Sequence, residues 1–217
     1  MQLDIVSDTV CPWCYIGKRR LEQAIAAWNG EPISVQWHPF QLDASIPAEG
    51  VDQKEYMTKR FGAGSDDRLK AARNAIAEAG LELGIPFRFD LAKLRPNTLD
   101  SHRLIRWAGT AGRQDAVVES LFRRFFTEGE DIGNPDVLLA AAEEAGMDLD
   151  IVRGLLASDA DKDFVLQEDM QARNMGIQSV PSFIANSKWL LVGAQDAATL
   201  LRAFEQIAAQ SAQAEAS

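Results

Sequence analysis

The sequence is poor in cysteine and histidine and has no excess of positive charge. Of its 217 residues only two are Cys and two are His, and Asp plus Glu outnumber Lys plus Arg by 32 to 22. Two Cys cannot build the set of several disulfides that holds small secreted domains together. The formal net charge of -10 argues against nucleic acid or an anionic membrane as the main partner.

Long hydrophobic runs and a secretory leader are also missing. No apolar stretch approaches the ~18 residues that a membrane span needs. Met1 leads directly into an alternating pattern, without the basic and apolar segments of a signal peptide. Because the two cysteines do not form a framework of structural disulfides, we expect a protein of the cytosol, where thiols stay reduced. The acidic charge and the lack of a long apolar run predict no membrane partner.

Both cysteines stand at a predicted junction between a strand and a helix. Residues 2–7 alternate polar and apolar side chains, as a strand does, and apolar residues recur at near-helical spacing over residues 15–28. The sequence Cys-Pro-Trp-Cys at residues 11–14 falls between them. Pro12 suits the first turn of a helix, where its missing N–H is not needed.

This position predicts a division of roles between the two thiols. A thiolate at a helix N-terminus faces free N–H groups and the positive end of the helix dipole, which lower the pKa of the thiol. We therefore expect Cys11 to be the nucleophile. Cys14, one turn deeper and less exposed, is expected to be the resolving thiol.

Zinc binding is the main alternative for this pair of cysteines. With no other Cys in the chain, zinc would need His38 and His102, whose spacings differ from those of any compact zinc site. A redox dithiol is the better interpretation, and no metal is predicted.

The rest of the chain divides into two α/β segments around a helical block. A strand at 33–38 completes a strand–helix–strand opening, and a strand at 180–185 with a returning strand at 189–192 forms a predicted hairpin. Helices without strands are expected between them, at 52–61, 65–79, from Asn97 as N-cap, 115–127, 135–145 and 149–157. A helix at 160–175 and one from Asp196 to about 207 flank the hairpin.

These elements predict a domain organisation. Residues 1–46 and 160–210 would form one discontinuous α/β domain, 47–159 an inserted helical domain and 211–217 a frayed tail.

Five short stretches together resemble a known family. They are residues 8–14, 39–42, 97–103, 176–183 and 192–195. The chain resembles the DsbA-like branch of the thioredoxin superfamily and, more narrowly, the cytoplasmic FrnE-type oxidoreductases. The resemblance implies an α/β thioredoxin-like fold with an inserted all-helical domain. It also implies a cis bond between Val180 and Pro181 beside the dithiol, whereas the local sequence taken alone favours a trans proline that opens an edge strand.

Other residues are candidates for substrate binding, each with a plainer alternative. Trp13 and Phe40 offer apolar surface, although core packing explains Phe40 equally well. Asn97 fits a helix cap, His102 fits a hydrogen-bonded helix histidine, and Gln195 fits a turn.

The predicted function is that of a thiol–disulfide oxidoreductase acting on a protein or a small-molecule thiol. No cofactor is expected, and the resemblance makes glutathione a possible co-substrate. Some FrnE-type members carry a second cysteine pair, which this chain lacks, so any activity that needs it is not expected. The alternatives are a glutathione-dependent isomerase or transferase of the same architecture, whose members carry serine in place of Cys11, and a polypeptide-binding holdase.

Overall fold

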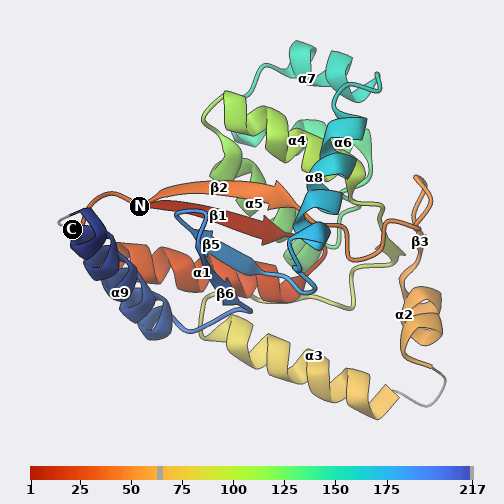
Figure 1. Cartoon of the computed structure of the whole chain (residues 1–217). Helices are drawn as coiled ribbons and strands as arrows, with labels where there is room; N and C mark the ends of the chain where they lie inside the picture. Colours follow the sequence, from red (N-terminus) through yellow and green to blue (C-terminus); the bar gives the residue numbers. More distant parts are fainter. Residues whose placement is uncertain (63–65, 216–217) are drawn as a thin grey trace.

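The computed structural model describes residues 1–62 and 66–215, which fold around a four-stranded sheet (Figure 1). The strands are β1 (Gln2–Ser7), β2 (Ser34–Pro39), β5 (Ser182–Ala185) and β6 (Trp189–Val192), in the order β2-β1-β5-β6. β1 and β2 are parallel, while β5 is antiparallel to both β1 and β6. The predicted strand–helix–strand opening and the hairpin are both confirmed.

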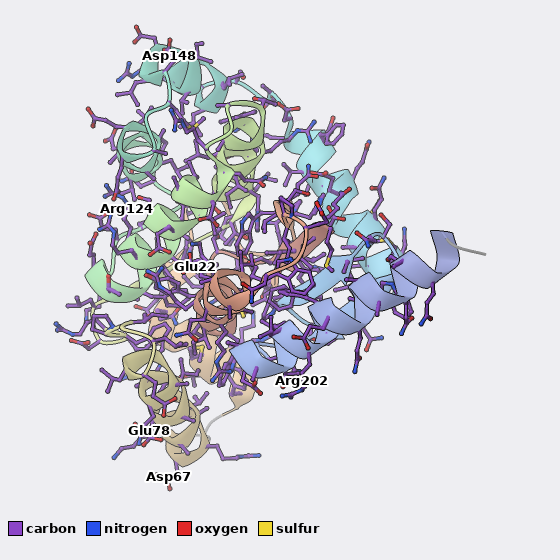
Figure 2. The ribbon with its side chains drawn as sticks, turned by 90° about the vertical axis from the view of Figure 1, so that its left-hand side faces the viewer. Glu22, Asp67, Glu78, Arg124, Asp148 and Arg202 are labelled. Atoms are coloured by element: carbon purple, nitrogen blue, oxygen red, sulfur yellow. The ribbon has the colours of Figure 1, made fainter. Side chains whose placement is uncertain are left out.

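Two helices cover one face of the sheet. α1 (Pro12–Ala27) follows β1 directly and packs against α9 (Ala197–Glu215). Figure 2 looks close to the axis of α1, and in that view Glu22 of α1 lies above Arg202 of α9 and Glu78 of α3 (Asp66–Leu81). Buried residues of α1, among them Ile16, Leu21 and Ala24, join the core with the inner residues of β1.

The other face is covered by helices from the middle of the chain and by α8 (Lys162–Asn174). α4 (Leu99–Thr110), α5 (Gln114–Arg123) and α8 each contact β2. The middle of the chain also contains α2 (Gln53–Phe61), α6 (Pro135–Glu144) and α7 (Leu149–Leu156), together with α3, which contacts α1. An aromatic cluster of Tyr15, Phe87, Phe122 and Phe126 joins α1 to the block.

Most helix boundaries follow the capping signals in the sequence. The side chains of Asn134 and Asp196 accept hydrogen bonds from the first turns of α6 and α9, as predicted. α4 begins one residue later than predicted, so Thr98 rather than Asn97 is the N-cap. Thr98 makes no capping hydrogen bond with its side chain, and the side chain of Asn97 still supplies one by accepting from the backbone N–H of Leu99, as Asn134 does from the N–H two residues after it.

Three features differ from the sequence-based expectation. The helical block contains a short antiparallel ladder of β3 (Val51–Asp52) and β4 (Leu94–Arg95), which is too short to produce an alternating pattern. A π-helical turn, η1 (Arg124–Glu128), interrupts the predicted helix at 115–127. The tail expected to fray from residue 211 continues α9 to Glu215, because Ala, Gln and Glu favour helix.

Some predictions concern residues that the structure does not describe or features that it does not test. Ser65, the predicted start of α3, and the last two residues of the chain lie outside the described residues. Within residues 1–62 and 66–215, no helix combines the length and apolarity that a membrane crossing requires. The division into a discontinuous domain and an inserted domain stays a proposal.

Candidate functional site

The two thiols lie where β1 ends and α1 begins. Cys11 is the N-cap residue of α1 in extended conformation, and Pro12 occupies the first helical position. The backbone N–H of Cys11 donates to the carbonyl of Asp8, and that of Cys14 donates to the carbonyl of Cys11, each at 3.0 Å. Both are free thiols, Cys11 being 5% exposed and Cys14 fully buried. The strand therefore delivers Cys11 to the helix terminus, with Cys14 one turn beneath it.

The surroundings separate the pKa values of these thiols. A hydrogen bond from the Cys14 thiol lowers the pKa of Cys11, with smaller contributions from the backbone N–H groups of Cys14 and Trp13 and against the opposing effect of burial. Burial raises the pKa of Cys14 well above its usual value, and the interaction with Cys11 adds to this effect. The helix terminus contributes to the acidity of Cys11 as expected, but the neighbouring thiol contributes more.

The Val180–Pro181 segment lies against the dithiol. Its peptide bond is cis, and the Sγ of Cys11 lies 3.6 Å from the carbonyl oxygen of Val180. The carbonyl of Pro181 accepts a hydrogen bond from Gly193 at 2.8 Å. A Cβ at Gly17 would lie only 2.9 Å from the Pro181 ring, so glycine in α1 permits this close approach. The structure thus brings residues 11–14 together with Val180 and Pro181.

A buried polar cluster lies on the α4 side of the dithiol. One carboxylate oxygen of Asp8 accepts a hydrogen bond from the N–H of Leu42, and the other lies 3.4 Å from the Nε2 of His102. Among the described residues, this oxygen and Nε2 have no other partner. Thr9 and Ser101 share a hydrogen bond of 2.8 Å between their hydroxyls. These contacts fix the loop that carries Cys11 to the first turns of α4.

The remaining candidates have structural contacts of their own. Phe40 is buried beneath the guanidinium of Arg173, and Asn97 donates to the carbonyl of Ile46. The Gln195 side chain is exposed and donates to the carbonyl of Val192 in its own turn. Trp13, by contrast, is 38% exposed beside Cys11. Of these aromatic candidates only Trp13 presents surface to a substrate.

Three residues near the dithiol were missed by the sequence interpretation. Asp8 and Gly17 carried usable sequence signals, because Asp8 is an acidic residue three positions before the predicted nucleophile and Gly17 is a glycine inside a predicted helix. Arg95 carried none. Its guanidinium is buried, donates to the carbonyl of Val10 at 3.3 Å and lies over the ring of Tyr56.

Potential metal ligands do not gather in this structure. Within the two described ranges, no group of three or more His, Cys, Asp and Glu side chains is placed to hold a metal ion. His38 is engaged elsewhere, with its Nε2 2.9 Å from Asp4.

The sequence matches one family model over almost its whole length. The model described as a DSBA-like thioredoxin domain covers residues 2–205. The uncharacterized protein YwbO of Bacillus subtilis is 27% identical over 185 residues, which is 85% of this chain and 86% of that protein.

Solved structures with the same fold include two bacterial oxidoreductases. A probable DsbA oxidoreductase from Streptomyces coelicolor superposes with a TM-score of 0.86 at 28% identity, over 95% of this chain and 89% of the other. The cytosolic disulfide reductase DsbM from Pseudomonas aeruginosa, solved with GSH, has a TM-score of 0.63 at 19% identity, over 97% of this chain and 100% of the other. The second likeness concerns the fold alone.

Proposed function

Since this chain belongs to the DSBA-like thioredoxin domain family, we propose that it exchanges disulfides through Cys11 and Cys14. The family is one of oxidoreductases, and the chain is an enzyme of that class. The finer proposal assigns the roles: Cys11 attacks the substrate, and Cys14 resolves the resulting mixed disulfide.

The contrast between the two thiols carries this proposal. Cys11 combines a lowered pKa with a place at the N-terminus of α1, whereas Cys14 is fully buried with a raised pKa. Because the thiolate is the nucleophile, the thiol with the lower pKa starts the reaction. Burial keeps Cys14 protonated until Cys11 has reacted.

The reaction proceeds in two exchanges. The Cys11 thiolate attacks one sulfur of a substrate disulfide, a mixed disulfide forms, and the other substrate sulfur leaves as a thiolate. Once Cys11 no longer carries negative charge, Cys14 gives up its proton, which the released substrate thiolate takes up, and attacks the Sγ of Cys11. The second substrate thiolate then leaves, so the substrate gains two electrons and the Cys11–Cys14 pair loses two.

The same steps run in reverse oxidise a substrate dithiol. In the reductive direction a small thiol must restore the Cys11–Cys14 dithiol, and glutathione is the proposed co-substrate. We place the reaction in the cytoplasm, a proposal supported by the cytosolic relative DsbM. No resident cofactor is needed for either direction.

Trapping experiments test the assignment of roles. Cys14→Ser should accumulate a mixed disulfide with a substrate peptide through Cys11, visible by mass spectrometry. Cys11→Ser should abolish disulfide reduction and accumulate none. Turnover that survives the loss of Cys14 would instead favour a glutathione-dependent isomerase or transferase, and trapping through Cys14 alone would reverse the roles.

A further inference from the structure

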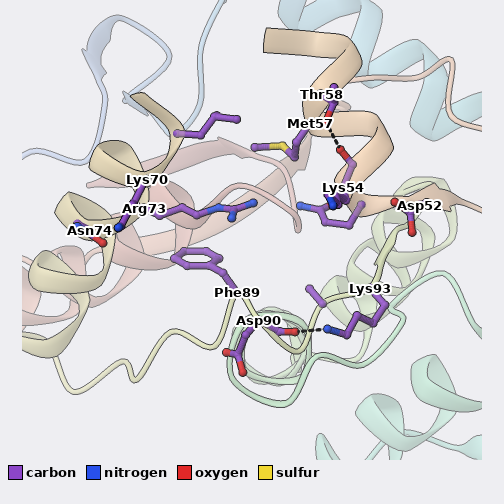
Figure 3. A pocket seen from close by; sticks show the side chains of 13 residues that line it. Asp52, Lys54, Met57, Thr58, Lys70, Arg73, Asn74, Phe89, Asp90 and Lys93 are labelled. Atoms are coloured by element: carbon purple, nitrogen blue, oxygen red, sulfur yellow. Dashed lines mark hydrogen bonds between the residues drawn. The ribbon is translucent and has the colours of Figure 1, made fainter. Parts of the chain in front are cut away.

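A groove between α2 and α3 leads to the residues that flank Cys11. Its outer part, of about 640 Å³, is lined by α2, α3 and the connector before β4 (Figure 3). An inner recess of about 100 Å³ shares Met57, Arg73 and Phe89 with the outer part and reaches Val10 and Pro12. The recess is thus lined by the two residues that flank Cys11 in the sequence, although Cys11 itself is not part of the lining.

Basic side chains outnumber acidic ones in the lining. Groove and recess together are lined by six basic side chains and two acidic ones, although the chain as a whole carries a net charge of -10. Asp52 is occupied as the cap of α2, and Asp90 pairs with Arg88. Within the described ranges, Lys54, Lys70 and Arg73 form no ion pair at all, so their charges face open solvent in the groove.

Arg95 is the strongest single indication of an anionic ligand. Its side chain lines the inner recess and is 8% exposed, yet it pairs with no carboxylate among the described residues. Its Nε has no hydrogen-bond partner within residues 1–62 and 66–215. A buried guanidinium without a counter-charge is costly, and a carboxylate bound in the recess would remove that cost.

The arrangement of charges favours an extended ligand over a compact one. Figure 3 shows Arg73 pointing across the groove from α3, with the ring of Phe89 beneath it and Lys54 on the opposite wall. The cations therefore lie along the walls, on three separate elements, instead of converging on one point. Between them, part of the recess is apolar and is lined by Val10, Ile76, Phe125 and Phe126.

From this lining we infer that the groove binds an acidic polypeptide segment next to the reacting cysteine of a protein substrate. A carboxylate close to that cysteine pairs with Arg95, and more distant acidic side chains lie along Lys54, Lys70 and Arg73. This inference rests on the proposed disulfide exchange and adds the substrate class that the same site selects.

Matched disulfide peptides test the inference. One peptide carries three Glu residues beside its disulfide-bonded cysteine, and the other carries Gln at the same places. With the unchanged protein at low ionic strength, kcat/KM for the Glu peptide should exceed that for the Gln peptide by about tenfold, the effect of two or three exposed ion pairs. The preference should shrink in high salt, which screens such charges.

Charge reversal locates the effect. The double variant Lys70→Glu with Arg73→Glu, both exposed on α3, should reduce the preference to about unity or invert it. The matched control is Lys188→Glu with Arg202→Glu, which changes the net charge equally. Lys188 lies in the β5–β6 turn, at the opposite end of the sheet from the dithiol, and Arg202 lies on α9. An equal loss of preference in both double variants would overturn the groove assignment.

Arg95→Gln separates the recess from the outer groove. It should abolish the preference for Glu at the position next to the cysteine, while Glu at the more distant positions should still raise kcat/KM. If only the nearest carboxylate matters in the unchanged protein, the ligand is a small thiol and the polypeptide assignment is wrong.

Binding without redox chemistry separates this inference from the proposed function. A fluorescent Glu peptide with Ser in place of its cysteine should bind more tightly than its Gln counterpart, as measured by anisotropy, and α3 charge reversal should remove the difference. If binding follows this pattern while no disulfide is reduced, the redox function fails and the groove assignment stands. If disulfides are reduced without any charge preference, the groove assignment fails and the redox function stands.

Discussion

The dithiol lies between two regions of opposite character. On the α4 side, Arg103 is fully buried and donates to the carbonyls of Leu155, Ser158 and Ala160 at 2.7 to 2.8 Å. On the α2–α3 side, Lys54, Lys70 and Arg73 are exposed and unpaired among the described residues. None of the residues of α2, all of which the structure describes, is buried.

Because of this difference, basic side chains have different roles in the two regions. Where a cation satisfies several carbonyls inside the protein, it holds elements together and contributes to stability. Where cations line a groove without partners, they contribute little to folding and remain available to a ligand. The two regions can therefore be told apart by measuring stability and substrate preference separately.

Replacing one cation with Met in each region gives the largest contrast. Arg103→Met should lower the free energy of unfolding by about 3–5 kcal/mol, because three carbonyls lose their donors and Asp100 loses its partner. Lys70→Met should change it by less than about 0.5 kcal/mol, as for an exposed side chain. Urea unfolding followed by circular dichroism measures both, and similar losses would refute the contrast.

Gly17→Ala tests how tightly the dithiol helix is packed on its other side. The added methyl group would lie 2.9 Å from the Pro181 ring, so we expect a loss of about 1–3 kcal/mol in unfolding free energy and slower disulfide reduction. Gly154→Ala in α7 is the control, since a Cβ there meets no atom within 4 Å. That variant should be stabilised by about 0.5–1 kcal/mol, as is usual for Gly to Ala inside a helix.

The sequence predicted the dithiol region well and the groove not at all. β1, α1 and β2 have clear periodicity, and Cys11 and Pro12 carry local signals that need no tertiary information. Arg95 belongs to a two-residue strand, and its importance arises only when β4 places it behind Val10. The exposed cations of α2 and α3 look like any solvated helix face until the fold brings them to opposite walls.

The candidates that lie in turns and helix caps show a second limit of prediction from sequence. Phe40, Asn97 and Gln195 lie in stretches that resemble the family, yet each has contacts that account for it structurally. A short motif cannot tell whether a side chain shapes the loop or faces the substrate, because that depends on elements distant in the sequence.

His38, also on the side covered by α4 and α8, should give a small dependence of stability on pH. Burial disfavours the charged ring, but hydrogen bonds to Glu168 and Asp4 outweigh it and raise the pKa of His38. The stabilisation is complete below the unfolded pKa of about 6.5 and is lost as the pH rises through the higher folded value. Between about pH 6 and 8 the unchanged protein should therefore lose slightly more stability than His38→Gln, which urea unfolding at both pH values measures.

Alkylation of the two thiols at a series of pH values tests the central claim most directly. Iodoacetamide labelling followed by peptide mass spectrometry measures the rate at each cysteine separately. The account predicts that Cys11 reacts with a midpoint below 9.0, the ordinary value, and that Cys14 stays unmodified over the same range. Cys14→Ala should raise the Cys11 midpoint, because the hydrogen bond from Cys14 is lost. Faster labelling of Cys14, or a Cys11 midpoint at or above 9.0, would contradict the assignment of Cys11 as the nucleophile.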